Sequence, residues 1–209
     1  MSDPIAEIPA AALVEMINQT VFSISNEESR FTLNGALMVL KPESLTLVAT
    51  DGHRLAMVEK PMNLGGTGVY RALLPKKAMT EILKLAGEAG DASFQFAATD
   101  NHLFFRLGQR LLISRKLTGN FPDYDRVLPK DHANSVTMSK EEMKATIERV
   151  AQFADDRSHA VRMQIGDGEL TVHSSLSDTG ESEGEIGEAL KFSLDKQKDR
   201  HEPAFLYLF

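Results

Sequence analysis

Few residues in this sequence have the types and spacing that enzyme chemistry requires. The glycine-rich run Leu64–Gly68 lacks the Gly-Lys-Ser/Thr ending with which a P-loop holds phosphates, so a flexible hairpin loop explains it better. The chain contains no cysteine, which excludes thiol nucleophiles, disulfides and cysteine-ligated metal centres. The sequence therefore predicts a protein without catalytic residues and without a cofactor.

Metal binding is not predicted either. The six histidines fall in no His-Glu-x-x-His pattern or other ligand spacing. Two acidic groups could in principle hold a hard cation, namely Asp155–Asp156 and the run that contains Glu181, Glu183 and Glu185. Acidic clusters of this kind more often form a solvated helix end and a polar loop, and we prefer that interpretation.

Charge is distributed unevenly along the 209 residues. The formal net charge is −7, yet residues 1–130 contain 14 basic and 14 acidic side chains, so the acidic excess lies in residues 131–209. An acidic chain does not bind nucleic acid through its bulk charge. Lys76, Lys77 and Lys84 would nevertheless form a basic stripe for phosphate groups if two helices shared one surface. Three tolerated surface lysines are the alternative.

The elements that must position these residues repeat along the chain. A helical pattern begins at Pro9, and three short apolar segments follow it, at Phe31–Leu40, Leu45–Thr50 and Leu55–Val58. Asp51-Gly52 predicts a two-residue hairpin turn between the last two segments. The same order of helix and strands then occurs again up to residue 117. It consists of a strand, a helix that begins at Pro75 and three more strands. This pattern predicts an α+β half-unit that occurs twice.

A third, incomplete copy follows an extended connector at Thr118–Pro129. Ser139 and Glu142 form a capping-box pattern at the start of the next helix. Two strands, Val161–Ile165 and Leu170–Val172, are expected after it. We therefore divide the chain into a complete domain at 1–130, a partial domain at 131–190 and a tail at 191–209.

Three motifs point to a known family. Glu28–Gly35, then Val48–Ala56, then Gly119–Tyr124 followed by Val127–Pro129, resemble the bacterial sliding clamp, the beta subunit of DNA polymerase III. The resemblance implies an α+β sliding-clamp fold, in which residues 5–130 form the middle domain. Residues 136–188 resemble the first half of the third domain.

The resemblance also implies a function. The family forms a ring dimer around double-stranded DNA, with its helices lining the hole, and tethers the polymerase catalytic subunit, the clamp loader and other proteins without catalysis of its own. Positions that match the family's partner-peptide pocket are Leu33, Thr50, Gly52, His53, Arg54, Leu55, Pro122, Arg126 and Val127. Positions that match DNA-facing residues are Arg30, Phe31, Lys76 and Lys77.

The chain departs from the family in three respects. The resemblance includes no first domain, it ends halfway through the third, and Lys191–Phe209 do not resemble the family. The chain would then be a gene fragment with an out-of-frame tail or a short product, and a module that competes for clamp-binding peptides is the alternative function.

The tail and the cellular location give two further expectations. Leu208 and Phe209 end the tail in a Leu-x-Leu-Phe pattern. They are either a chance apolar end or a ligand for the groove formed by Leu33, Thr50, Leu55, Pro122 and Val127. Because the sequence shows neither a membrane-spanning run nor a secretory signal, we expect a cytoplasmic protein without membrane contact.

Overall fold

A computed structural model describes most of the chain, and it divides into two units. The described residues are 3–65, 68–87, 92–128, 138–154, 160–166, 169–174, 190–193 and 205–208. The first unit comprises Met1–Leu128 together with Glu202–Phe209, and the second comprises Pro129–His201. The acidic groups considered above as cation ligands lie outside the described residues.

The first unit contains the predicted half-unit twice. The first copy consists of β1 (Ala6–Pro9), α1 (Ala10–Asn18), β2 (Gly35–Lys41), β3 (Ser44–Thr50) and β4 (Arg54–Pro61). The second copy consists of β5 (Tyr70–Pro75), α2 (Lys76–Ala86), β6 (Ser93–Ala98), β7 (His102–Leu107) and β8 (Arg110–Arg115). The predicted α+β class and the duplication are confirmed.

The two copies exchange their first strands. One sheet has the order β1-β6-β7-β8, so the first copy lends β1 to the strands of the second. The other sheet has the order β12-β4-β3-β2-β5, where β5 belongs to the second copy and β12 is Phe205–Leu208. Separating the two copies would break the β1–β6 pairing in one sheet and the β2–β5 pairing in the other. The two copies therefore form one folding unit.

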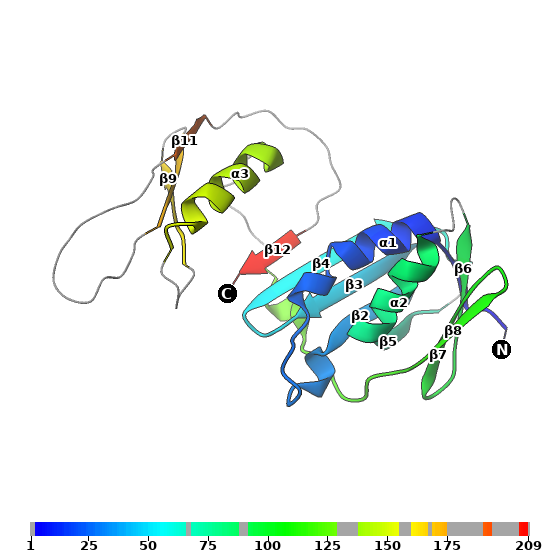
Figure 1. Cartoon of the computed structure of the whole chain (residues 1–209). Coiled ribbons are helices and arrows are strands. Elements are labelled where there is room, and N and C mark those ends of the chain that lie inside the picture. The colour runs from blue at the N-terminus through cyan, green and yellow to red at the C-terminus, as the bar shows by residue number, and fades with distance from the viewer. Residues whose placement is uncertain are drawn as a thin grey trace. The chain divides into compact units, whose positions relative to one another are not determined.

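The two helices lie side by side on one face of the sheets (Figure 1). Each begins after a proline, Pro9 or Pro75, at the position where the missing N–H is not needed. Their apolar sides are buried against the core of the unit, in which Phe94, Phe96 and Phe105 are fully enclosed. This packing leaves the opposite sides of both helices on the surface.

A second apolar cluster covers the other face of the β2-β3-β4 sheet. It consists of Leu37, Val39, Val48, Leu55, Leu73 and Tyr124. Tyr124 comes from the connector that follows β8, which crosses this face of the sheet. For this reason β2 is buried on both faces from Gly35 to Leu40, and only Lys41 is exposed. The sequence predicted an alternation of buried and exposed residues instead. The expected strand also begins later, because Phe31–Leu33 form a 3₁₀ turn.

The second unit contains α3 (Lys140–Ala151), β9 (Arg162–Gly166), β10 (Glu169–His173) and β11 (Leu190–Ser193). The Ser139 hydroxyl accepts the backbone N–H of Glu142 at 3.3 Å, as the capping pattern predicts. The strands form a sheet of order β11-β10-β9, and α3 packs on β10. The expected boundary after residue 190 lies inside β11, a strand that the sequence did not reveal.

None of the helices in the described ranges is both long and apolar enough to cross a membrane.

Candidate functional site

The turn between β3 and β4 organises the site. Asp51–His53 connect the strands, so the turn has three residues rather than the predicted two. Thr50 fixes both ends of it, because its hydroxyl donates to the Arg54 carbonyl at 2.7 Å and accepts the Gly52 N–H at 3.0 Å. Thr50 and Leu55 are directly paired across the ladder. Five of the predicted pocket residues therefore lie in one compact hairpin.

The carboxylate of Asp51 is the acceptor around which this turn is built. Its Oδ1 accepts the backbone N–H groups of His53 at 2.9 Å and Arg54 at 3.0 Å, and its Oδ2 is 3.0 Å from Arg54 Nε. Partial burial alone would raise the pKa of this carboxyl. The two backbone donors and the Arg54 guanidinium outweigh that effect and lower the Asp51 pKa below its ordinary value.

The same contacts aim the Arg54 side chain. Besides Asp51, its guanidinium donates through Nη2 to the Phe22 carbonyl at 2.9 Å, and its Cζ lies 5.9 Å from the centre of the Phe22 ring. Phe22 is 45% exposed. Arg54 and Phe22 thus form a fixed cationic and aromatic pair at the surface beside the turn.

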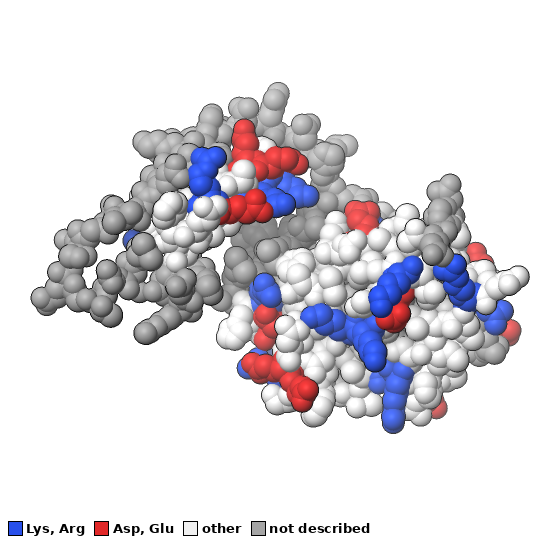
Figure 2. All heavy atoms as spheres, viewed as in Figure 1, with Lys and Arg blue, Asp and Glu red and all other residues white. Residues whose placement is uncertain are grey.

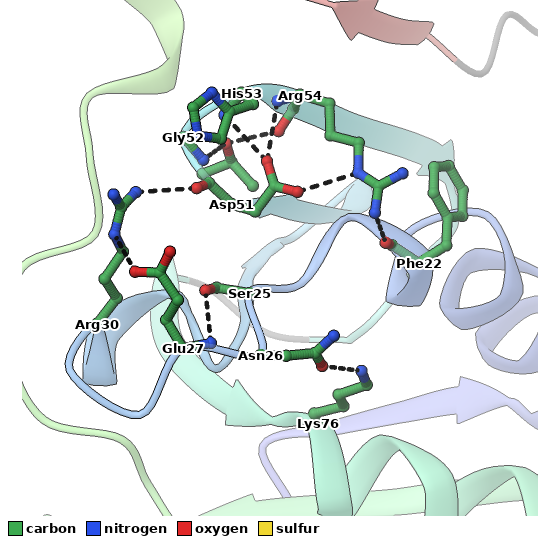
Figure 3. A network of polar contacts seen from close by, with 11 residues as sticks. Phe22, Ser25, Asn26, Glu27, Arg30, Asp51, Gly52, His53, Arg54 and Lys76 are labelled. Carbon is green, nitrogen blue, oxygen red and sulfur yellow. Dashed lines mark hydrogen bonds and ion pairs between the residues drawn. The ribbon is translucent and has the colours of Figure 1, made fainter. Parts of the chain in front are cut away.

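Arg30 approaches the turn from the opposite direction (Figure 3). Its Nη1 donates to the Asp51 carbonyl at 3.1 Å, and its Nε pairs with Glu27 at 2.8 Å. Gly52 has a φ of +91°, and a Cβ there would lie 2.9 Å from Arg30 Nη1. A predicted DNA residue, Arg30, and a predicted pocket residue, Arg54, are therefore held by one turn. Sequence reasoning treated Asp51 only as a turn former and missed this role.

Lys76 joins the same region through the loop that follows α1. Its Nζ donates to the side chain of Asn26 at 2.8 Å. Asn26 is followed by Glu27, which forms the ion pair with Arg30. Lys77 is exposed one position further along α2. Phe31 is 70% exposed on its 3₁₀ turn. Figure 2 shows Lys and Arg side chains across the face that carries α1 and α2, with some acidic side chains between them.

The connector, which carries Pro122, Arg126 and Val127, crosses the face of the sheet that holds the second apolar cluster. Gly119 has a φ of +113°, and a Cβ there would lie 2.5 Å from the Thr32 side chain, so the connector is in close contact with the turn that carries buried Leu33. Further along, Tyr124 belongs to the second apolar cluster, which also includes Leu55. Burial and the neighbouring Asp125 raise the pKa of the Tyr124 hydroxyl.

Three predicted residues lie on the exposed part of this connector. Arg126 Nε pairs with Asp123 at 2.8 Å, and both side chains are open to solvent. Val127 is 45% exposed, and its N–H donates to the Tyr124 carbonyl at 3.1 Å. Pro122 is exposed as well. These three residues are close to Tyr124 in the sequence. The structure nevertheless leaves their side chains on the surface, whereas Tyr124 is buried in the second apolar cluster.

A cavity of about 630 Å³ lies where the connector passes β2 and β5. Its walls include Leu37, Arg71, Arg115, Phe121 and Tyr124. Pro122 is the one predicted pocket residue in its lining. The cavity therefore does not coincide with the predicted pocket. Sequence reasoning could not find it, because it depends on a connector crossing a sheet face.

Known proteins share both the sequence pattern and the fold. The family model of the DNA polymerase III beta subunit central domain matches residues 7–123, and that of its C-terminal domain matches residues 125–195. The Beta sliding clamp of Caulobacter vibrioides is 32% identical over 178 residues, which are 83% of this chain and 48% of the relative. That of Chlamydia pneumoniae is 32% identical over 89% of this chain and 50% of the relative.

Solved structures agree. The crystal structure of the Caulobacter crescentus beta sliding clamp superposes with a TM-score of 0.80 at 28% identity and covers 96% of this chain and 52% of that one. The DNA polymerase III subunit beta of Pseudomonas aeruginosa, at 24% identity, shares the fold with a TM-score of 0.81. The chain spans about half the length of the curated relatives it matches. It belongs to the DNA polymerase III beta subunit family, of which it contains the central domain and part of the C-terminal domain.

Proposed function

We propose that this chain supplies a non-catalytic part of a DNA sliding clamp, with one surface for duplex DNA and another for partner peptides. The network around Asp51 carries the proposal, because it fixes Arg30 and Arg54 on the two sides of one turn. The names of the relatives support the same assignment. The partners would be double-stranded DNA, the polymerase catalytic subunit and the clamp loader.

The DNA surface would be the face that carries α1 and α2. Lys76 and Lys77 stand at the start of α2, and Arg30 and Phe31 stand at the end of the loop that Lys76 contacts through Asn26. Lysine and arginine side chains bind phosphate oxygens of any sequence, so the contact would be non-specific and sensitive to salt. A protein that must slide along DNA needs this kind of contact.

The peptide surface would be the β4 end of the hairpin together with the connector. The hairpin would supply buried Leu55 and the surface cation of Arg54. The connector would supply buried Tyr124 and the surface cation of Arg126. An extended peptide with apolar side chains suits this combination, because such ligands bury a few anchors and leave a polar rim.

Charge reversal at the start of α2 tests the DNA surface. In fluorescence anisotropy with a labelled duplex, we expect Lys76→Glu with Lys77→Glu to abolish binding at low salt. Acidic side chains are favourable in the first turn of a helix, so the variant should keep its fold. Lys140→Glu with Lys144→Glu on α3 is the matched control, since it changes the net charge equally. Equal loss in both variants would show bulk charge and refute the assigned surface.

A titration with a labelled peptide that carries Leu-x-Leu-Phe tests the other surface. Leu55→Ala should weaken the binding of this peptide at least tenfold, because Leu55 is 2% exposed in the second apolar cluster and supports the hairpin. Leu111→Ala on β8, where the side chain is 42% exposed, is the control and should bind like the parent chain. Undetectable peptide binding by the parent chain would contradict this half of the proposal.

A further inference from the structure

The outer edge of β4 is occupied by the C-terminal residues of the same chain. In the five-stranded sheet, β12 lies beside β4, and the two strands run antiparallel (Figure 1). The register places Tyr207 opposite Leu55 and Leu208 opposite Arg54. Both of these β4 residues belong to the predicted peptide pocket. The ladder therefore ends at the turn that carries the site.

The chemistry of both strands explains this pairing. The outer edge of β4 presents backbone N–H and C=O groups that need hydrogen-bonding partners, and an open edge invites another strand. Phe205–Leu208 alternate aromatic and leucine residues, and the aromatic residues favour strands. The pairing joins segments about 150 positions apart and places the C-terminal residues with the first unit.

This arrangement differs from both alternatives that the sequence left open for the tail, a chance apolar end and a groove ligand. The second alternative placed Leu208 and Phe209 in a groove between Leu33, Thr50, Leu55, Pro122 and Val127. The structure instead places Leu208 by backbone pairing along β4, and Phe209 lies outside the described residues.

We propose that the outer edge of β4 is a strand-addition site and that Phe205–Leu208 is its internal occupant, which an extended partner peptide must displace. The competition rests on the proposed peptide-binding function, whereas the strand pairing does not. Strand addition is a general way of binding extended peptides, in which main-chain hydrogen bonds give affinity. Because the register runs to Leu55 and Arg54, an added peptide strand and β12 would require the same edge.

The size of the effect follows from the occupancy. If β12 occupies the edge nine-tenths of the time, one-tenth of the molecules can accept a competing strand, and the apparent affinity falls about tenfold. Removing β12 should restore this factor. The tail peptide supplied as a separate molecule should then bind about tenfold more tightly than it binds the parent chain.

A single substitution in the tail tests the proposal in the full chain. Tyr207→Pro lacks a backbone donor and cannot hold its place in the ladder, whereas the matched control Tyr207→Phe keeps an aromatic strand former. We expect Tyr207→Pro to speed hydrogen exchange of those β4 amides that face β12, and Tyr207→Phe to leave their rates unchanged. Equal exchange in both variants would overturn the pairing.

The second readout uses a labelled peptide with the sequence Ala204–Phe209. It should bind Tyr207→Pro about tenfold more tightly than Tyr207→Phe. Equal affinity for both would overturn the proposal. So would a dimer, measured by light scattering, that Tyr207→Pro dissociates, because the occupant would then come from a second copy.

Failure of the proposed function remains distinguishable from failure of this inference. If duplex DNA binds to neither variant and Leu55→Ala leaves the peptide affinity unchanged, but the exchange rates and the tail peptide behave as expected, strand addition stands without the clamp function. If the Leu-x-Leu-Phe peptide binds both variants equally, the tail does not compete and the inference is overturned while the function stands.

Discussion

At the scale of single residues, Asp51 connects the two candidate surfaces. Its carboxylate holds Arg54, and its carbonyl holds Arg30. The sequence motif made the region recognisable, but it did not show this division of labour. A carboxylate is an obvious turn former in sequence, whereas its contact with an arginine 21 positions away requires the folded chain.

Asp51→Asn should change how stability depends on pH. The pKa of Asp51 is lowered in the folded state, so its carboxylate stabilises the fold above the unfolded pKa and loses this effect as the pH falls through the folded pKa. The parent chain should therefore lose more stability between about pH 5 and pH 2 than Asp51→Asn does. At pH 7 the variant should be less stable by about 1 kcal/mol, because an amide is a weaker acceptor.

Thermal melts across this pH range measure the difference. Asp100→Asn, in the turn between β6 and β7, is the control for removing one carboxylate. Parallel stability curves of Asp51→Asn and the parent chain would contradict the assigned role.

Gly52→Ala should damage the DNA surface as well as the turn. Its φ of +91° is unfavourable for alanine, and the new Cβ would meet Arg30 Nη1 at 2.9 Å. The backbone term should cost about 1–2 kcal/mol of stability. Displacing Arg30 should in addition weaken the binding of duplex DNA.

Gly65→Ala is a matched control for this substitution. Gly65 has a φ of +72°, but a Cβ there would have no heavy atom within 4 Å among the described residues beyond its chain neighbours. It should destabilise the fold through the backbone alone and leave DNA affinity unchanged. The difference between the two variants in fluorescence anisotropy then reports the Arg30 contact. Equal DNA affinities would show that Arg30 does not need its place beside Gly52.

At the scale of elements, the proposed peptide surface depends on the connector. The connector lies against the sheet because Gly119 allows a close approach to Thr32 and because Tyr124 is buried in the second apolar cluster. Gly119→Ala should therefore lower the free energy of unfolding by about 2 kcal/mol and weaken the Leu-x-Leu-Phe peptide.

A second substitution can distinguish the two causes by which Gly119→Ala should lower stability, the steric contact with Thr32 and the unfavourable backbone conformation. Thr32→Ser removes the methyl group that the new Cβ would meet at 2.5 Å, but it leaves the φ of +113° unfavourable. The double variant should recover part of the lost stability in urea denaturation. If it recovers nothing, the close approach to Thr32 is not what requires glycine.

How much of these elements the sequence predicts depends on the range of the interactions. Local signals worked: Pro9, Pro75 and Ser139 mark the helix starts, and the apolar runs mark most strands. Non-local pairings could not be predicted, because the exchange of β1 and β5 between the copies leaves no pattern within either copy. The same holds for the double burial of β2 and for the pairing of β12 with β4.

The candidate site was predictable to the same extent. The residues from Thr50 to Leu55 are contiguous in sequence and form one hairpin, as expected. The connector residues Pro122, Arg126 and Val127 were identified from the family motif, and spacing alone would not have singled them out. The Arg54 contact with Phe22 has no sequence signal, because the carbonyl that accepts from Arg54 could belong to any residue.

At the scale of the whole molecule, the two units should differ in independence. Both sheets of the first unit, both helices and the covering connector lie within residues 1–128, apart from the edge strand β12. A chain of residues 1–130 should therefore fold alone, because every exchanged strand stays with its partner. Limited proteolysis of the full chain should correspondingly leave a core that ends near Pro129.

The isolated piece should fold but associate with itself. Without β12, the outer edge of β4 becomes an open strand edge, and such edges pair with other chains. We expect residues 1–130 to melt cooperatively in circular dichroism and to show a mass that rises with concentration in light scattering. Adding the Ala204–Phe209 peptide should reverse this rise, because it covers the same edge. If the piece is a monomer at all concentrations, with or without the peptide, the edge of β4 does not need a neighbouring strand. If it shows no cooperative melt, the first unit depends on residues beyond 130.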